Sequence, residues 1–321
     1  MLKTEISYDQ EIVLGRKQSL WKRCQRSFMR DKFLWLLIAP GICFITLFCY
    51  VPMYGVLIAF QNFSPYKGMA ASPWIGFAHF QDFFGSSDFW RLIKNTVLIS
   101  VYSLIFGFPV PIILAIVLNE IRTKWFKKIV QTVSYLPYFI SIVVVCGMIK
   151  DFLQPSTGIV NQVIKALGGE PVYFLLQPQY FKAIYVISGI WQSMGWNSII
   201  YLAAIAGIDP GLYEASIIDG ANSFKRVWHI TLPGLLPTIS ILLIMNLGSI
   251  LSVGYEKIIL LYNDNTLSTA DVISTYVYRR GLVQAEYSFG AAVGLFQNVI
   301  NFLLIVIANY TVRRLTETSL W

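Results

Sequence analysis

Residues that could carry out chemistry are sparse in this chain. The sequence contains no G-x-x-x-x-G-K-[ST] phosphate loop and no H-E-x-x-H zinc motif. His79 and His229 are its only histidines, and both are expected to be surface or interface residues rather than general bases. The four cysteines show no C-x-x-C spacing, which argues against a disulfide framework and against a metal site. The sequence therefore predicts no catalytic residue and no bound metal.

Polar side chains do recur at helical spacing inside three strongly apolar stretches. Ser188, Gln192 and Trp196 share one helical face, with Trp191 and Asn197 beside them. Two further stripes, with steps of three or four residues, are Asn246, Ser249, Ser252 and Glu256, and Gly290, Gly294, Gln297 and Asn301 with Asn298 adjoining. Such stripes either line a polar path or bond across packed helices, and both interpretations stay open at this point.

The composition indicates which solvent these stripes face. Of the 321 residues, 56% are hydrophobic and 13% are charged, and the mean hydropathy is +0.60. Soluble proteins carry about 25% charged residues. This excludes an ordinary soluble enzyme and a disordered chain. The net charge is +8. In a protein of this composition the positions of the basic residues matter more than their sum, because they orient the helices in the membrane, and the charge does not predict a nucleic-acid partner.

Six stretches are long and apolar enough to cross a bilayer as helices. They are residues 33–60, 92–118, 129–149, 181–207, 234–255 and 288–310. The first is longer than a bilayer requires and contains Pro40 and Pro52, which predict a kink or an interfacial extension. The sequence thus predicts an all-α integral membrane protein with six transmembrane helices.

The basic residues predict the orientation of these helices. If the N-terminus is cytoplasmic, 16 of the 25 Lys and Arg residues fall in the inner segments, as the positive-inside rule requires. The predicted parts are a basic cytoplasmic segment (1–32), a six-helix domain (33–310) with a cytoplasmic loop at 208–233, and a cytoplasmic tail (311–321). Within the first part, residues 15–31 are either a helix in the headgroup layer or a basic tail.

The loop at 208–233 contains residues that typically start and end helices, in an order that predicts two short helices. Asp209 can cap the first helix, and Gly220 can take the left-handed conformation that closes it. Asn222 or Ser223 can cap the second, which is expected to run to about residue 230 before Pro233 starts the next span. Helices this short need a surface to pack on.

This loop resembles the signature of permease subunits of binding-protein-dependent ABC importers. The family pattern is E-A-A, three residues, G, nine residues and I-x-L-P. The matching residues are Glu214, Ala215, Ser216, Gly220, Ile230, Leu232 and Pro233. Ser216 replaces the second alanine and is still small enough for close helix packing. The resemblance extends to further stretches of the chain, which are similar to sequences of carbohydrate-importer permeases, especially of the group that imports complex oligosaccharides. These stretches are residues 40–60, 95–100, 135–141 and 271–296.

The resemblance implies a fold, partners and a location in the cell. The fold would be the type I, maltose-permease-like fold, in the bacterial cytoplasmic membrane. The partners would be a second homologous permease, two ATPase subunits that hold ATP and Mg, an extracytoplasmic binding protein and an oligosaccharide. The loop residues named above, together with Asp219, would form a coupling helix docked on the ATPase, with Glu214 paired to a basic residue there. The alternative for Glu214 is stabilisation of the first helical turn.

A sugar needs amides for its hydroxyls and an aromatic face for its C–H side. The predicted substrate path is therefore Gln192, Trp196, Asn197, Asn246, Tyr255, Gln297, Asn298 and Asn301. Arg279 and Arg280 suit either an acidic oligosaccharide or a headgroup layer. The rival function is an ion-gradient-driven transporter, which would need paired carboxylates in broken helices, and Glu256 is the nearest candidate.

Overall fold

The structure is a computed structural model in which residues 31–316 are described. The chain divides into two compact units, residues 1–57 and 58–321. The described part is helical, with one isolated β-bridge between Gln61 and Trp74 and no strand in residues 31–316. The predicted headgroup-layer helix at 15–31 lies outside the described residues, apart from Asp31.

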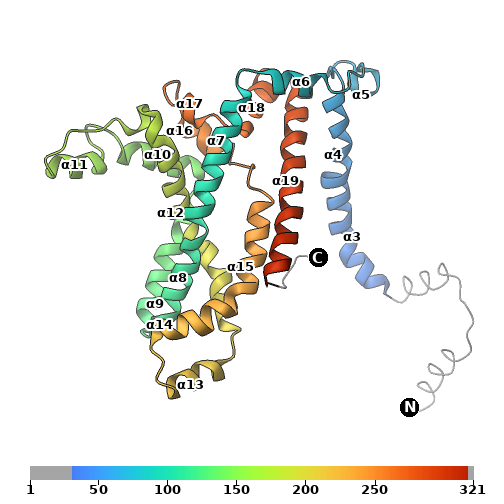
Figure 1. The fold of residues 1–321 in the computed structure, drawn as a ribbon. Coiled ribbons are helices and arrows are strands. Elements are labelled where there is room, and N and C mark those ends of the chain that lie inside the picture. Colours follow the sequence, from blue (N-terminus) through green and yellow to red (C-terminus); the bar gives the residue numbers. More distant parts are fainter. Residues whose placement is uncertain (1–30, 317–321) are drawn as a thin grey trace, which may run out of the picture. The chain divides into compact units, whose positions relative to one another are not determined.

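The first apolar stretch forms one continuous helical segment whose hydrogen-bond pattern changes along its length (Figure 1). Its parts are α3 (Lys32–Ile45), the π-helical turn η1 (Thr46–Tyr50), α4 (Val51–Met53) and the 3₁₀ segment η2 (Tyr54–Phe60). The helix runs unbroken past both prolines, with π and 3₁₀ turns along it, and the expected kink or interfacial extension stays a prediction.

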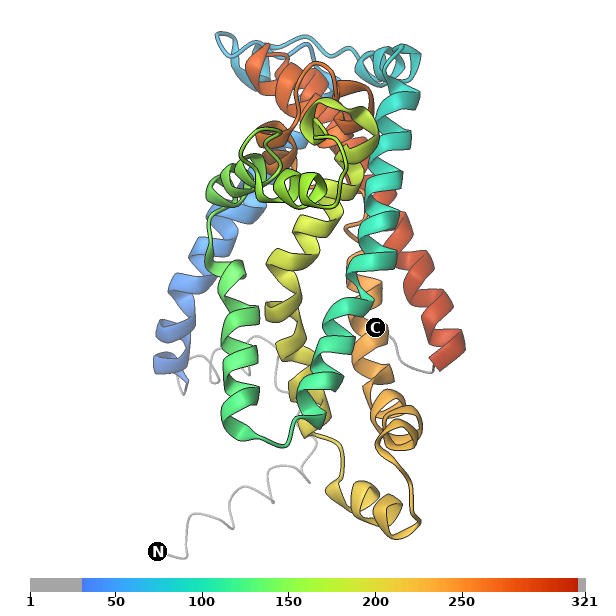
Figure 2. The same ribbon diagram turned by 90° about the vertical axis from the view of Figure 1, so that its left-hand side faces the viewer.

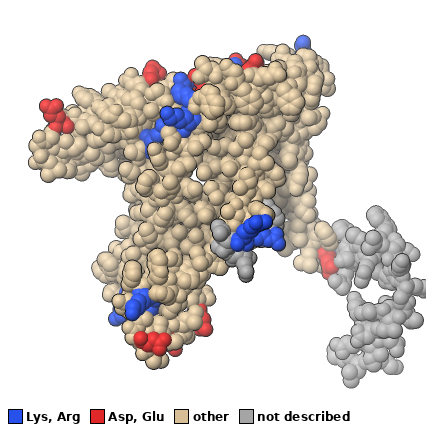
Figure 3. Space-filling view, in the orientation of Figure 1, with Lys and Arg blue, Asp and Glu red and all other residues tan. Residues whose placement is uncertain are grey.

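Three helical segments of the second unit are both long and strongly apolar. The first consists of α7 (Phe89–Tyr102), the π turn η3 (Ser103–Gly107) and α8 (Pro109–Glu120). The second consists of α14 (Ser223–Arg226), the π turn η6 (Val227–Thr231) and α15 (Leu232–Leu247). The third is the single helix α19 (Tyr287–Thr316). Together with Lys32–Phe60, these are the four helices in the described residues that are long and apolar enough to cross a membrane. On the face shown in Figure 3, charged side chains lie near the upper and lower ends, with one further cluster of Lys and Arg at about mid-height.

The predicted third span is bent. It consists of α9 (Lys124–Tyr135) with the 3₁₀ turn η4 (Leu136–Phe139), followed by α10 (Ile142–Phe152) at an angle of 103°. Pro137 lies in the 3₁₀ turn, and Ser141 caps α10 by accepting a hydrogen bond from Val144 N (3.4 Å). Counting this pair as one span gives five, so the six predicted spans are reproduced only in part. The predicted fourth span is α12 (Pro178–Ala206), whose length is sufficient but whose polar residues reduce its apolar character.

Short helices complete the second unit. At one end lie α5 (Gly68–Ala71), α6 (Ala78–Gly85), α11 (Ile159–Ala166), η5 (Phe174–Leu176), α16 (Tyr255–Leu261), α17 (Leu267–Ala270), α18 (Ile273–Val277) and the π segment η7 (Tyr278–Val283). At the other end lies α13 (Pro210–Ile218), joined to α12 and α14 (Figure 2).

Proline positions explain three of the π-helical turns. Pro52, Pro109 and Pro233 each lie two residues after the last residue of a π segment. A proline lacks the N–H that would bond to residue i−4, and its ring clashes with that carbonyl in an α-helix. A wider π turn relieves the clash while the helix continues. This corrects the expectation that Pro233 separates a short helix from the next span, because residues Ser223–Leu247 form one continuous helix.

Helix α12 packs against α7, α8, α9, α15 and α17 and is thus the central element of the second unit (Figure 2). Tyr201 and Ile205 on α12 are buried with Ala115 on α8 and Leu235 on α15. At the other end of the helix, Phe181 is buried among residues of α7, α10, α16 and α17. Burial at both ends fixes the polar middle of α12 relative to its neighbours.

At Gly195 the backbones of α12 and α9 approach each other closely. A β-carbon at this position would lie 2.0 Å from the backbone oxygen of Ser134, so the two backbones would have to separate. We expect Gly195→Ala to destabilise the protein by about 1–3 kcal/mol, as overpacking does. The thermal unfolding midpoint of the detergent-purified protein measures this loss.

Gly147→Ala is the matched control, because Gly147 lies within α10 and a β-carbon there meets nothing within 4 Å. Alanine has the higher helix propensity, so this variant should be neutral or slightly more stable. Equal midpoints for the two variants would show that the contact between α9 and α12 does not limit stability.

Candidate functional site: an exposed loop helix and a polar cavity

Helix α13 is held in place by the caps that the sequence predicts. Asp209 accepts a hydrogen bond from Gly211 N at 2.9 Å, and Pro210 is the first helical residue. Gly220 has φ +75°, the left-handed conformation that a β-carbon would strain. Asn222 caps the following helix by accepting a hydrogen bond from Lys225 N at 2.9 Å. The predicted starts of both helices are therefore confirmed.

The loop helix presents apolar side chains to its surroundings. Leu212, Ile217 and Ile218 of α13 are exposed, and Ile218 has 86% of its surface accessible. Phe224 and Trp228, on the adjoining helix, are also exposed. Glu214, Ala215 and Asp219 lie on the same short helix or at its end and are exposed as well, whereas Ser216 is half-buried. An exposed apolar cluster of this kind marks an interaction surface.

Contacts to the long helices connect this surface to the rest of the second unit. The Tyr213 hydroxyl is 2.9 Å from Thr231 Oγ1, in the π turn that leads into α15. Arg226 donates to the backbone oxygen of Ala221 (3.1 Å) and lies 3.8 Å from Glu120 at the end of α8. Because α14, η6 and α15 are one continuous helix, the contact of Tyr213 with Thr231 connects α13 to α15. Ile230, Leu232 and Pro233 of the signature are part of this helix.

A cavity of about 530 Å³ lies between α7, α8, α12, α15 and α16. Its size is within the range of small-molecule sites. The polar side chains that line it are Ser100, Ser103, Tyr185, Gln192, Ser193, Asn197, Tyr201, Asn246, Ser249, Ser252 and Lys257. Hydroxyls and amides therefore dominate its polar lining, as a site for a sugar requires.

Three of the eight predicted substrate-path residues line this cavity: Gln192, Asn197 and Asn246. Gln192 Nε2 donates to the backbone oxygen of Ile140 at 3.3 Å, at the break between α9 and α10. Asn246 Nδ2 donates to Leu242 O at 2.8 Å, within its own helix. The cavity thus brings together amides from two of the three stripes.

The other five predicted residues lie elsewhere. Gln297 and Asn301 are buried and bind the irregular segment after α15: Gln297 Nε2 donates to Leu251 O (2.9 Å), and Asn301 Oδ1 accepts from Leu251 N (3.1 Å). Asn298 and Tyr255 are exposed, and Tyr255 stacks on Tyr278.

Trp196 is also outside the cavity. Its ring stacks on Tyr138 at 4.7 Å, on the side of α12 that faces the bent third segment. The assignment of these five residues to the substrate path rests on their spacing alone. Glu256, the carboxylate considered for an ion-driven mechanism, is exposed at the start of α16 and does not line the cavity either.

Sequence reasoning missed some cavity residues. Ser100 and Ser103 are three residues apart in the second span, a spacing that the stripe criterion would have found if applied there. Lys257 was missed because it follows the last residue of the stripe that ends at Glu256, and only the fold of the segment after α15 returns it to the cavity.

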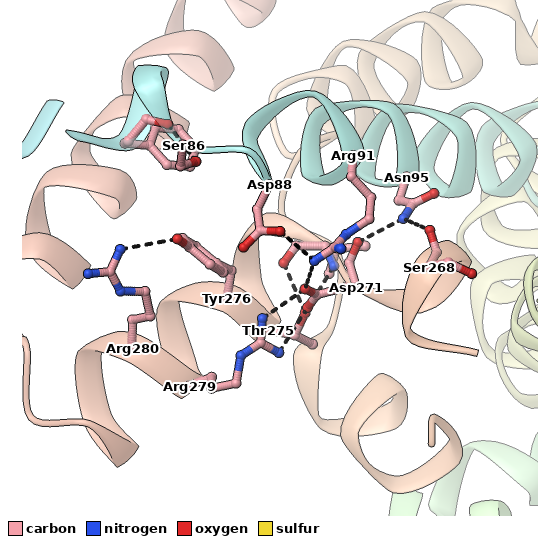
Figure 4. Close-up of polar contacts among 12 residues, drawn as sticks. Ser86, Asp88, Arg91, Asn95, Ser268, Asp271, Thr275, Tyr276, Arg279 and Arg280 are labelled. Atoms are coloured by element: carbon pink, nitrogen blue, oxygen red, sulfur yellow. Dashed lines mark hydrogen bonds and ion pairs between the residues drawn. The ribbon is translucent and has the colours of Figure 1, made fainter. Parts of the chain in front are cut away.

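At the end opposite α13, a buried carboxylate connects three helices (Figure 4). Asp271 is fully buried and receives both arms of the Arg279 guanidinium, at 3.2 and 2.8 Å. Arg91 of α7 lies 3.3 Å from the same carboxylate, and Thr275 donates to it at 2.8 Å. The hydrogen bond to Asp271 raises the pKa of Arg279 above its ordinary value. These contacts join α7 to α17, α18 and η7.

Both arginines that the sequence left open as contacts for an acidic sugar or for headgroups have protein partners. Arg279 pairs with Asp271 as described. Arg280 lies 2.5 Å from Glu286, donates to the Tyr276 hydroxyl at 3.1 Å and stacks over Phe289 at 3.9 Å. Their contacts therefore account for both residues without a ligand.

Comparisons with known proteins agree with this architecture. Residues 107–317 match the family described as the inner membrane component of binding-protein-dependent transport systems. The chain is 40% identical to the polygalacturonan/rhamnogalacturonan transport system permease protein YteP of Bacillus subtilis (strain 168), over 97% of both chains.

Two solved structures are similar over nearly the whole chain. A bacterial ABC transporter that imports the acidic polysaccharide alginate has a chain 47% identical to this one, with a TM-score of 0.85 over 92% of this chain and 99% of that chain. The second structure is a bacterial alginate ABC transporter in complex with an alginate pentasaccharide-bound periplasmic protein. Its similar chain is 46% identical to this one, with a TM-score of 0.86 over 94% of this chain and 100% of that chain. The chain therefore belongs to the inner membrane components of binding-protein-dependent transport systems, as a multi-pass permease subunit of an ABC importer for oligosaccharides.

Proposed function

We propose that this permease moves an oligosaccharide by alternating access and that α13 transmits the force from a separate ATPase. In this proposal the chain crosses the bacterial cytoplasmic membrane six times, counting α12 and the bent α9–α10 pair as spans, with both termini in the cytoplasm. A second homologous permease completes the path. Two ATPase subunits bind ATP and Mg, and an extracytoplasmic binding protein delivers the sugar.

The observation that carries this proposal is the exposed apolar surface of α13, together with the contact of its Tyr213 with Thr231 in the continuous helix Ser223–Leu247. Ile217 and Ile218 contribute little to packing among residues 31–316, since both are exposed there. An interface buries apolar residues of this kind in its centre and charged residues at its rim. Glu214 lies beside them and is suited to pair with a basic residue on the rim of an ATPase groove.

The cavity supports the sugar as cargo. It is lined by hydroxyls and amides from α7, α12 and α15 and has room for sugar rings between them. Because one wall consists of α15, a displacement of α13 that moves α15 would change the shape of the cavity. The similar importer that transports alginate, and the relative named for polygalacturonan/rhamnogalacturonan, suggest a uronate-containing oligosaccharide as cargo here too.

Co-purification and energised uptake test the proposal together. A tagged full-length chain, expressed with its native neighbours, should extract in mild detergent with an ATPase and a second permease. Oligosaccharide uptake by the same cells should stop when ATP is depleted and should continue when an ionophore collapses the ion gradients. Uptake that depends on the ion gradient and survives ATP depletion would instead support a secondary transporter.

A further inference from the structure

The polar cavity contains a single charged side chain. Of the described residues that line it, Lys257 is the one that carries a charge, and none is Asp or Glu. Lys257 belongs to α16, beyond the end of the fifth span, and its ammonium reaches back to α12. The ammonium lies against α12 near Gly189, where a β-carbon would be 3.5 Å from Lys257 Nζ, an ordinary van der Waals distance.

The ammonium of Lys257 is buried with little to balance its charge. Only 7% of the residue surface is exposed. Its hydrogen-bond acceptor among the described residues is Tyr185 O at 3.0 Å, and it lies 4.8 Å from the centre of the Tyr185 ring. An ammonium has three N–H donors, so two remain for another acceptor. Burial lowers the pKa of Lys257 to about 8, which still leaves it mostly protonated at neutral pH.

A purely structural role, in which Lys257 only anchors α16 to α12, does not explain why a charged residue is buried at this position. Tyr185 O is a carbonyl within α12 that already accepts from Ser188 Oγ at 3.2 Å. A neutral carbonyl compensates only part of the free energy lost when an ammonium leaves water. A carboxylate compensates more, since it pairs the charge and accepts the remaining N–H donors.

The geometry points to Lys257 as the residue that recognises the carboxylate of a uronate unit inside the cavity. The amides of Asn197 and Asn246 and the hydroxyls of Ser100 and Ser103 would meet the hydroxyls of the same or a neighbouring sugar unit. This inference rests on the proposed function, because it requires that oligosaccharide passes through the cavity. Lys257 is then a specificity-determining residue that favours acidic over neutral saccharides.

The test uses the complete importer in cells and three kinds of trisaccharide probe. These are alginate and galacturonan trimers as free acids, the same trimers as methyl esters, and neutral maltotriose. The wild type should take up at least one free acid. Lys257→Met keeps the side-chain length and removes the charge, and it should lower uptake of that acid at least about tenfold. Lys257→Arg, which keeps the charge, should retain much more of the uptake.

The controls separate charge recognition from damage to the fold. Lys165→Gln removes one positive charge from an exposed position on α11 and should leave uptake unchanged. Any ester or maltotriose uptake should be equal in the wild type and in Lys257→Met. The binding protein is identical in all strains, so a change in the ratio of acid to neutral uptake belongs to the permease.

Several results would overturn the inference. Unchanged acid uptake by Lys257→Met would do so, as would a wild type that transports only maltotriose. If both Lys257 variants take up none of the probes and the second permease is missing from their purified complexes, Lys257 has a structural role instead. These outcomes keep the importer function. ATP-independent uptake, or no uptake of any probe by the wild type, would instead refute the proposed function itself.

Discussion

Glu214→Lys is expected to uncouple the permease from its ATPase while leaving it folded in the membrane. Glu214 is exposed on α13, so the substitution disturbs no contact within the described chain. At an interface with a basic residue it would replace an attraction by a repulsion, and such changes cost about 2–5 kcal/mol. The ATPase should then be lost from the detergent-purified complex, and ATP-dependent uptake should fall at least about thirtyfold.

Glu170→Lys is the matched control for this experiment. It makes the same change of charge at an exposed residue in the loop after α11, at the end of the protein opposite α13 (Figure 1). Expression, membrane insertion and ATPase association should match the wild type. If Glu214→Lys retains the ATPase and transports at the wild-type rate, then Glu214 only stabilises its own helix, and the docking role in the proposed function is wrong.

Local signals in the loop at 208–233 allowed its structure to be predicted closely. Asp209, Gly220 and Asn222 act through their own backbone or through residues two or three positions away. Caps and left-handed glycines depend on neighbours in the sequence, so a single chain contains the information. The error at Pro233 arose because a π turn, which the sequence does not announce, lets the helix continue through the proline.

The substrate path was less predictable, because a helical stripe shows which residues share a face but not what that face meets. Gln297 and Asn301 satisfy the backbone of the irregular segment after α15, a partner that exists only once that segment has broken from the helix. Lys257 reaches the cavity through the same break. The bend between α9 and α10 was hidden for a related reason, since hydropathy alone does not distinguish a straight span from a broken one.

Asp271→Ala is expected to be the most destabilising of the substitutions considered. Asp271 is fully buried and is the shared partner of Arg91 and Arg279 (Figure 4). Removing it leaves the Arg279 guanidinium without its carboxylate partner, and it leaves Arg91 with only the partly exposed Asp88. Breaking a buried pair in this way costs about 3–5 kcal/mol. The thermal unfolding midpoint in detergent should fall by roughly 10 °C.

Asp88 provides an internal comparison, because it pairs with the same arginine. Its carboxylate lies 2.9 Å from Arg91, but a third of its side-chain surface is exposed. Exposed ion pairs contribute about 0–1 kcal/mol, so Asp88→Ala should change the midpoint by a degree or two. The two variants thus compare the stability lost when Arg91 loses a buried carboxylate partner with the stability lost when it loses a solvent-screened one. Similar midpoints for both would mean that burial of Asp271 does not hold α7 to α17 and α18, and that other contacts of Asn95 and Thr96 across this boundary are sufficient.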